Sequence, residues 1–282
     1  MKVIDDISSL NHSISSSKSN NLCVGLVPTM GALHEGHLSL VKLASTQCDL
    51  TIVSLFLNPT QFNDKNDLTN YPSDIESDMT LLENEKCDIL FVPNTAEMYP
   101  NGLITNSYEL NGLDKAFEGA KRDGHFDGVC TIVHRLLKIT KADKAFFGQK
   151  DFQQLAIIRQ LVQTLHLSTD IIAGPTIREK DGLAMSSRNQ LLSKSQRQRA
   201  SIIHEVLLKA KHLYGQLTIS AILNQIKEHI DTQAEMILDY VDIVHSHSLE
   251  PIKTFDYQDR AHILIAVYVG KVRLIDNLAL ND

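Results

Sequence analysis

The 282-residue sequence lacks a run of the roughly 18 or more apolar residues that a membrane-spanning helix needs. Its first 21 residues contain no hydrophobic segment of the signal-peptide type and carry acidic residues early, which argues against a secretory signal. The net charge is −7, whereas nucleic-acid-binding proteins usually carry a basic balance or a basic patch. We therefore expect a cytoplasmic protein with neither a membrane nor a nucleic acid as its partner.

Cysteine is scarce, and the four that occur are far apart. Cys23, Cys48, Cys87 and Cys130 form no C-x-x-C pair, so we expect reduced structural thiols. The chain also lacks G-x-x-x-x-G-K-[ST] and G-x-G-x-x-G. If the protein binds a nucleotide, it does so without a P-loop.

Apolar runs alternate with helical patterns through the first two thirds of the chain. Buried strands are predicted at 22–28, 50–57, 87–93, 144–148 and 170–177, and helices at 37–47, about 72–85, 129–140 and 151–165. Continuous apolar strands separated by amphipathic helices are typical of a parallel sheet with helices on both faces. The predicted class is therefore α/β, with a Rossmann-like, doubly wound sheet.

The pattern changes near residue 177. Two helices, at about 194–213 and 218–232, precede a strand at 237–245 and two strands that flank a turn at 270–271. We place a domain boundary there, which gives a Rossmann-like domain over 1–176 and a smaller α+β domain over 177–282. The serine-rich stretch 13–21 is predicted to be a loop.

Two histidines and two glycines follow the first predicted strand, in TMGALHEGH. Ligands of open α/β sheets bind at the carboxyl ends of the strands. Gly31 and Gly36 allow close backbone approach, and the helix that begins near His37 offers N–H groups to an anion. A zinc site at His34 and His37 is the less favoured alternative, because their spacing is not that of H-E-x-x-H and no third ligand is evident.

Two further polar clusters have residues suited to phosphate. In FFGQKDFQQL, Lys150 follows a strand and can meet a phosphate, while Asp151 can accept ribose hydroxyl groups or simply cap a helix. In GLAMSSRN, hydroxyl groups and the Arg188 guanidinium can grip a polyphosphate, or Ser186 or Ser187 can be a helix cap.

A fourth cluster, FLNPTQFN, follows the second sheet strand. Asn58 and Gln61 offer neutral amides, which suit the hydroxyl and carboxylate groups of a small polar molecule. A turn around Pro59 explains Asn58 well and Gln61 poorly.

PTMGALHEGH resembles the HxGH signature of the nucleotidyltransferase superfamily, and MSSR resembles the KMSKS loop of class I aminoacyl-tRNA synthetases. Together with FLNPTQF, GHFDGV and FFGQKDFQQL they are similar to the pantothenate synthetase (pantoate–β-alanine ligase) family, from about Gly25 to Asn189. The chain departs from the family at Gln149, often Glu, and at Asp123, often Pro. The resemblance implies a Rossmann-like fold, a homodimer, and magnesium-dependent conversion of ATP, (R)-pantoate and β-alanine into AMP, diphosphate and pantothenate through an enzyme-bound pantoyl adenylate.

The resemblance also implies site residues. His34, His37, Lys150 and Arg188 are expected to be catalytic, with His37 acting on the departing diphosphate. Gln61 and Gln154 are expected to bind pantoate, and Asp78 magnesium. Contact with ATP is expected from Met30, Gly31, Ala32, Leu33, His34, Glu35, Gly36, His37, Gly148, Gln149, Lys150, Asp151, Ile177, Met185, Ser186, Ser187 and Arg188.

Two other functions compete with this interpretation. A nucleotidyltransferase that leaves the nucleotide on its product needs a site for a phosphorylated acceptor, whereas Asn58, Gln61 and Gln154 favour an unphosphorylated acid. A nucleotide- or RNA-binding module without ligase chemistry is opposed by the acidic charge.

An acyl adenylate hydrolyses easily, so the domain at 177–282 is predicted to be a lid that excludes water.

Overall fold

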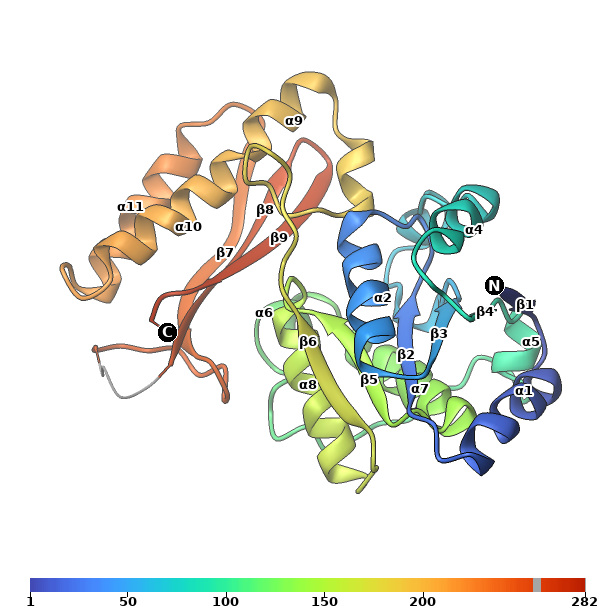
Figure 1. Ribbon diagram of the computed structural model, residues 1–282. Coiled ribbons are helices and arrows are strands. Elements are labelled where there is room, and N and C mark those ends of the chain that lie inside the picture. Colours follow the sequence, from blue (N-terminus) through green and yellow to red (C-terminus); the bar gives the residue numbers. More distant parts are fainter. Residues whose placement is uncertain (256–259, 282) are drawn as a thin grey trace. The chain divides into compact units, whose positions relative to one another are not determined.

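The computed structural model describes residues 1–255 and 260–281. The chain forms two compact units (Figure 1), and each is described by itself. The first unit comprises Met1–Gln149 and Gln153–Pro175, and the second comprises Lys150–Phe152 and Thr176–Asp282. The predicted boundary after residue 176 lies one residue beyond the start of the second unit's main segment. The assignment of Lys150–Phe152 to the second unit has no counterpart in the sequence-based prediction.

The first unit is built on a six-stranded parallel sheet with the order β1-β4-β3-β2-β5-β6. Strand β2 pairs with β3 from Val24↔Leu50 to Thr29↔Leu55, so the two strands end side by side. The predicted α/β fold is confirmed. The strands are β1 (Lys2–Ile4), β2 (Val24–Thr29), β3 (Leu50–Leu55), β4 (Ile89–Phe91), β5 (Lys144–Gly148) and β6 (Asp170–Gly174).

The direction of each crossover sets which face of the sheet a helix covers. From β2 the chain moves through β3 to β4, whereas the connections β1→β2, β4→β5 and β5→β6 run the opposite way. Because such crossovers are right-handed, the helices of the two directions cover opposite faces. One face receives α2 (Glu35–Gln47) and α4 (Ile75–Glu83), and the other receives α1 (Ile7–Ser19), α7 (His125–Thr140) and α8 (Phe152–Thr164).

Adjacent strands β2 and β5 therefore lead into helices on opposite faces. This is the topological switch point of the sheet, where open α/β proteins bind their ligands. The HxGH loop follows β2, and Gly148 ends β5. The fold thus brings two of the predicted clusters to the switch point by topology alone.

The prediction of a loop at 13–21 is wrong, because α1 continues through Ser19. Leu10 and Ile14 are buried on one face of this helix, which gives it a packing surface. The Asp6 carboxylate accepts the Ser9 N–H as an N-cap, and the Ser13, Ser15 and Ser19 hydroxyl groups donate to the carbonyls four residues earlier. Serine content alone therefore misjudged the segment.

Other helix boundaries also differ from the expected ones. Helix α7 begins at His125 rather than near 129, and the helix expected at 194–213 is divided at Ser201. The first unit also contains short helices that the apolar pattern did not indicate. They are η1 (Pro59–Gln61), α3 (Lys65–Thr69), α5 (Thr95–Met98) and α6 (Phe117–Lys121).

The second unit is a three-stranded antiparallel sheet with helices, as expected for the smaller α+β region. The strands are β7 (Met236–His245), β8 (Ala261–Val269) and β9 (Val272–Ala279), and the turn at 270–271 joins the last two. Ile203, Ile222 and Ile226 pack with Ile263 and Ile265 in one core. The helices are η2 (Ser187–Leu191), α9 (Lys194–Ala200), α10 (Ile202–Leu213) and α11 (Ile219–Asp231). Within the described ranges, no helix has the length and apolarity to cross a bilayer.

All four cysteines are free thiols, and Cys87 and Cys130 are buried. Burial raises the pKa of each of these two thiols to about 12. At about pH 8 only roughly one molecule in ten thousand then carries either thiolate, which is the reactive form. We expect iodoacetamide to leave both residues unmodified in the native protein while alkylating them in denatured protein, as measured by peptide mass spectrometry. Equal rates in the two states would contradict the burial.

Candidate active site

The HxGH loop leaves β2 through a turn that only a small residue can make. Gly31 has φ +89°, and a Cβ there would lie 3.2 Å from Asp78 Oδ2 and 3.3 Å from Leu55 Cδ2. Ala32 follows with φ 51°. Two consecutive positive φ values turn the chain sharply, so that α2 begins only a few residues after the end of β2.

His34 and His37 cap the amino terminus of α2. His34 Nδ1 accepts the Gly36 N–H at 3.1 Å, and His37 Nδ1 accepts the His34 N–H at 3.3 Å. The ring centroids are 4.1 Å apart. Because each Nδ1 accepts a hydrogen bond, the proton of each neutral imidazole is on Nε2. The pair adds two N–H donors to the positive end of the helix dipole, an arrangement suited to an anion.

Asp78 holds the same loop from α4. It is 2 % exposed, and its two oxygens accept the Ala32 N–H at 2.9 Å and the Leu33 N–H at 2.7 Å. Burial raises the pKa of this carboxyl, although the two backbone hydrogen bonds oppose the shift. Both carboxylate oxygens of Asp78 therefore hold the HxGH loop through hydrogen bonds. Its predicted role as a magnesium ligand stays a prediction, and the described part of the chain contains no cluster of three or more His, Cys, Asp or Glu residues that could hold a metal ion.

Replacement of Asp78 by Asn tests this contact. An amide can accept only one of the two N–H groups and presents its own NH₂ to the other, so we expect Asp78→Asn to lower the free energy of unfolding by about 1–3 kcal/mol. Turnover should fall with it, because the HxGH loop loses its support. Urea denaturation measures the first effect, and Glu76→Gln, an exposed acid on the same helix, is the control. Wild-type stability and turnover in Asp78→Asn would contradict the contact.

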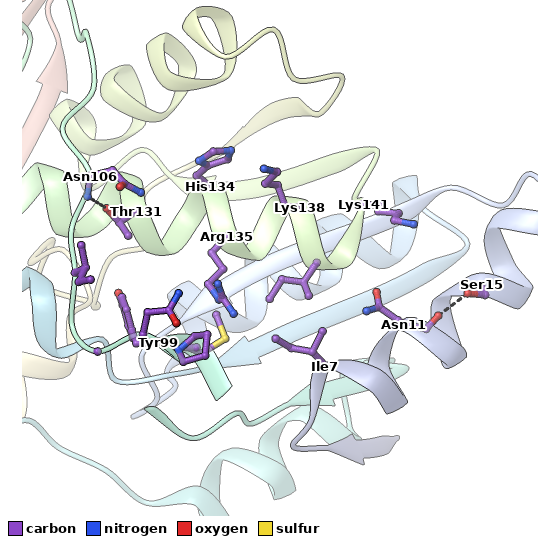
Figure 2. Close-up of a pocket in the computed structure, with 16 residues that line it drawn as sticks. Ile7, Asn11, Ser15, Tyr99, Asn106, Thr131, His134, Arg135, Lys138 and Lys141 are labelled. Carbon is purple, nitrogen blue, oxygen red and sulfur yellow. Dashed lines mark hydrogen bonds between the residues drawn. The ribbon is translucent and has the colours of Figure 1, made fainter. Parts of the chain in front are cut away.

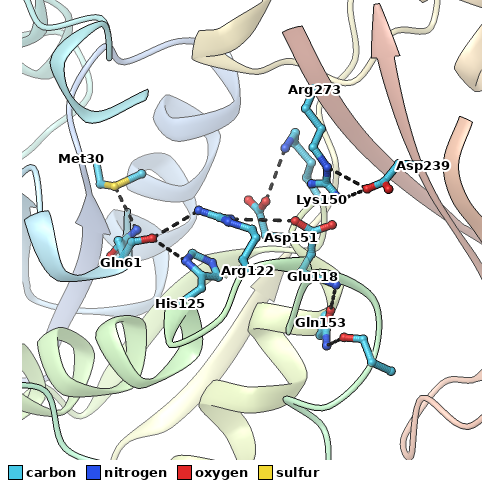
Figure 3. Close-up of polar contacts among 11 residues, drawn as sticks. Met30, Gln61, Glu118, Arg122, His125, Lys150, Asp151, Gln153, Asp239 and Arg273 are labelled. Atoms are coloured by element: carbon cyan, nitrogen blue, oxygen red, sulfur yellow. Dashed lines mark hydrogen bonds and ion pairs between the residues drawn. The ribbon is translucent and has the colours of Figure 1, made fainter. Parts of the chain in front are cut away.

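An amide cluster follows the neighbouring strand β3. Asn58 Nδ2 donates to Gln61 Oε1 at 3.0 Å. Gln61 Nε2 donates to Met30 Sδ at 3.1 Å (Figure 3). The Tyr99 hydroxyl donates to Asn58 Oδ1 at 2.6 Å. The Asn58 side chain does not cap η1 and instead orients Gln61, so a turn alone does not account for it. A Cβ on Gly128 would overlap the Thr60 carbonyl, which keeps α7 close to this cluster.

Sequence reasoning gave no role to several polar residues around Gln61. His125 Nδ1 lies 2.8 Å from Gln61 O, and an Arg122 N–H donates to the same oxygen at 3.3 Å (Figure 3). Arg122 also lies 3.9 Å from Glu118, which is buried. The quoted motif GHFDGV contains His125, but its spacing does not disclose a contact with a carbonyl 64 residues away.

Two adjacent glutamines on α8 differ in their surroundings. Gln153 is buried, donates to Leu113 O and Ala116 O at 2.7 and 2.8 Å, and accepts the Glu118 N–H at 2.9 Å. Gln154, the predicted pantoate ligand, is half-buried. Gln153 thus holds the segment that contains Glu118, whereas Gln154 lies on a more exposed side of the helix.

The phosphate loop expected around MSSR lies in the second unit. Met185 N–H donates to Ile177 O at 3.0 Å, and a bridge joins Arg178 to Ala184, so residues 177–185 form a hairpin. Ser186 caps η2 by accepting the Arg188 N–H at 3.3 Å, which is the cap that sequence reasoning weighed as an alternative. Ser187 is buried, whereas Met185 and Arg188 are partly exposed.

Lys150 and Asp151 also belong to the second unit. Lys150 Nζ lies 3.4 Å from Asp151 Oδ1 (Figure 3), and the two side chains are 20 % and 45 % exposed. Such an ion pair is weak, so it does not by itself prevent either group from binding a ligand. The flanking Gln149 belongs to the first unit, where its N–H donates to Gly174 O at 2.8 Å.

A cavity of about 680 Å³ lies elsewhere in the first unit, between α1, α7 and the segment after α5 (Figure 2). Arg135 and Lys138 of α7 contribute to its lining, as does Lys141, which follows the helix as its C-cap. None of the predicted site residues lines it. The cavity does not include the HxGH loop, but Tyr99, which donates to Asn58 of the amide cluster, contributes to its lining.

Comparisons with known proteins agree with this geometry. A family model described as pantoate-beta-alanine ligase matches residues 2–279. Among curated proteins, the pantothenate synthetase of Thermosipho africanus is 44% identical over 280 residues, covering 99% of both chains. That of Bacteroides thetaiotaomicron is 42% identical over 280 residues, covering 99% of this chain and 98% of its own.

Solved structures give the same result. Pantothenate synthetase from Thermus thermophilus superposes with a TM-score of 0.93 at 37% identity, with complete coverage of both chains. Pantoate-beta-alanine ligase from Francisella tularensis, complexed with beta-gamma ATP and beta-alanine, gives a TM-score of 0.84 at 36% identity, covering 99% of this chain and 98% of its own. The likeness thus includes both compact units.

Proposed function

The chain belongs to the pantoate–β-alanine ligase family, whose reaction is the ATP-dependent synthesis of pantothenate, and we propose that it proceeds through two half-reactions. In the first, the carboxylate of (R)-pantoate attacks the α-phosphorus of ATP and expels diphosphate, which leaves pantoyl adenylate on the enzyme. In the second, the amine of β-alanine attacks the acyl carbon and expels AMP.

Activation is necessary because a free carboxylate is a poor electrophile, and a carboxylic acid gives its proton to the amine instead of reacting with it. The acyl phosphate gives the acyl carbon a good leaving group, AMP. Because water also attacks this intermediate, the site must exclude it. We propose that the second unit acts as the lid that does so.

The paired histidines at the start of α2 are the single observation that carries this proposal. Their Nε2–H donors and the amino end of the helix suit the charge that develops on the departing diphosphate. His37 would serve as the acid on that group and His34 as a phosphate ligand. The other ATP contacts in the first unit would come from Met30, Gly31, Ala32, Leu33, Glu35, Gly36, Gly148 and Gln149.

The amide cluster is proposed to bind the two organic substrates. Gln61 is fixed by Asn58 and offers uncharged hydrogen-bonding groups, which suit the hydroxyl and carboxylate oxygens of pantoate. Gln154 would contribute a second amide. Gln61 is also the candidate for contact with β-alanine.

The second unit is proposed to contribute the remaining ATP ligands. Lys150 would bind the α-phosphate and Asp151 the ribose, and the Ile177 backbone would contact adenine. Met185, Ser186, Ser187 and Arg188 would contact the phosphates, with Arg188 as the principal cation.

Magnesium is proposed to arrive as a complex with ATP. Mg²⁺ commonly keeps several waters and is held by substrate phosphates with one or two carboxylates, so a protein cage is not needed. Asp78 is the carboxylate for which a metal role was expected, but its two hydrogen bonds to the loop support the positioning role more directly.

Two further properties complete the proposal. We propose a homodimer, which light scattering of the purified protein would measure. We also propose a cytoplasmic location, with which the four free thiols are consistent.

The decisive experiment supplies ATP, magnesium, pantoate and β-alanine and measures AMP and pantothenate, with each reactant omitted in turn. ATP–diphosphate exchange that depends on pantoate but not on β-alanine would support the adenylate. A stable product that bears the nucleotide would instead indicate a nucleotidyltransferase.

A further inference from the structure

The segment Lys150–Phe152 is attached to the sheet of the second unit at both of its ends. Asn277 Nδ2 donates to Lys150 O at 2.9 Å. The Phe152 ring stacks on His262, with centroids 4.0 Å apart and planes inclined by 18°. Because Asn277 pairs with Leu264, two residues after His262, both anchors project from the same face of β8 and β9.

Asn277 is itself held through its backbone by the ion pair between the partly exposed Arg178 and the buried Asp276. Arg178 Nη1 and Nη2 donate to the two Asp276 oxygens at 2.6 and 3.0 Å. Asp276 Oδ1 also accepts the Asn277 N–H at 2.8 Å, and Arg178 Nη2 donates to Asn277 O at 3.3 Å. Both backbone polar groups of Asn277 are therefore fixed by this pair.

The same guanidinium supports the hairpin that leads to MSSR. Arg178 Nη1 donates to Gly182 O at 3.0 Å, across the hairpin 177–185. The Lys150 backbone and the base of the MSSR loop are thus linked through one ion pair, which places two of the proposed phosphate-binding elements of the second unit in fixed register.

Burial of the polar groups of this network has a desolvation cost. The Asp276 side chain is 1 % exposed and Asn277 is 6 % exposed, in a strand whose other buried residue is Leu274. Buried charges need partners, and well-packed apolar residues often stabilise a protein as well as a buried ion pair does. What a polar network adds is a defined geometry for the groups it holds.

We propose that Asn277 is a positioning residue for Lys150, and that the Arg178–Asp276 pair holds Asn277 in register. This inference rests on the proposed role of Lys150 at the α-phosphate. Asn277 touches no reacting atom. Its amide fixes the Lys150 peptide, so a shift of that peptide would also displace the ammonium group at the end of the Lys150 side chain.

Asn277→Ala tests the proposal, with Asn281→Ala as the matched control. Asn281 Oδ1 accepts the Ala261 N–H at 2.6 Å, so the control also removes a hydrogen bond between an Asn side chain and the backbone in the same unit. We expect both variants to have lower melting temperatures. Only Asn277→Ala should slow pantoyl adenylate formation, roughly 10- to 100-fold in kcat of ATP–diphosphate exchange, with KM for pantoate little changed.

A second substitution tests whether the N–H donor of the Asn277 side chain, rather than the size of that side chain, is needed. Asn277→Asp keeps the size of the side chain but removes the N–H that Lys150 O accepts, so it should slow adenylate formation at least as much as Asn277→Ala. Wild-type exchange in Asn277→Asp would overturn the proposal.

A double-mutant cycle with Lys150→Ala tests whether Asn277 acts through Lys150. If it does, Asn277→Ala should slow adenylate formation little further in a protein that already carries Lys150→Ala. Full additivity, or equal rates for Asn277→Ala and Asn281→Ala, would overturn the positioning role while leaving Lys150 in the mechanism. An unimpaired Lys150→Ala single variant would instead remove Lys150 from the mechanism and the positioning role with it.

Discussion

Lys150→Ala is expected to slow pantoyl adenylate formation by about 10²- to 10³-fold, which corresponds to about 3–4 kcal/mol of transition-state stabilisation. A lysine ammonium is a point charge that gains most when negative charge builds up on the α-phosphate oxygens. Because its ion pair with Asp151 is weak and partly exposed, its removal should leave the melting temperature nearly unchanged. Rapid-quench measurement of diphosphate formation in a single turnover gives the rate of this half-reaction.

Lys144→Ala is the matched control, because Lys144 begins β5, whereas Lys150 follows the carboxyl end of that strand. The control should retain wild-type rates. Lys150→Arg keeps the charge but changes its geometry, and should lie between the wild type and Lys150→Ala. Near-wild-type turnover in Lys150→Ala would remove Lys150 from the mechanism.

His37→Ala is expected to slow adenylate formation on the order of 10²-fold and to affect aminolysis of the adenylate much less. The reason is that diphosphate departs only in the first half-reaction. Quenched flow resolves the two steps, since adenylate and AMP can be measured separately. Equal losses in both half-reactions would contradict a role on diphosphate.

Because His37 also accepts the His34 N–H, its loss has a structural effect of about 1 kcal/mol that must be separated from the chemical one. His37→Gln makes that separation. Glutamine at this third helical position can accept the same N–H in a capping box but cannot act as an imidazole. We expect His37→Gln to restore the melting temperature without restoring adenylate formation.

Five of the six strands of the sheet and its ligand-binding edge were predictable because their determinants are local, whereas the short strand β1 was not predicted. Each of β2, β3 and β5 is an apolar run, and the polar clusters follow those runs directly in the chain. Because strands alternate with helices along the chain and the crossovers are right-handed, the HxGH loop and Gly148 lie beside the same switch point. The histidines could be selected because their spacing and the flanking glycines are unusual after a first strand.

The supporting contacts were not predictable, because they join residues that are distant in the chain. Asp78 lies 46 positions from the Ala32 N–H that it accepts, and Arg178 lies 98 positions from Asp276. No period or motif encodes such pairs in a single sequence. Helix α1 was missed for a different reason: its serines satisfy their hydroxyl groups on carbonyls of the preceding turn, so composition suggested a loop where two buried aliphatic residues set the helix.

The interleaving of the two compact units has a consequence for recombination between family members. Lys150–Phe152 belongs to the second unit although the residues on both sides of it belong to the first, so the polypeptide passes from one unit to the other three times. A chimera made by a single crossover near residue 176 would join one parent's Lys150 to the other parent's Asn277. Functional hybrids should therefore need residues 150–152 inherited together with 176–282.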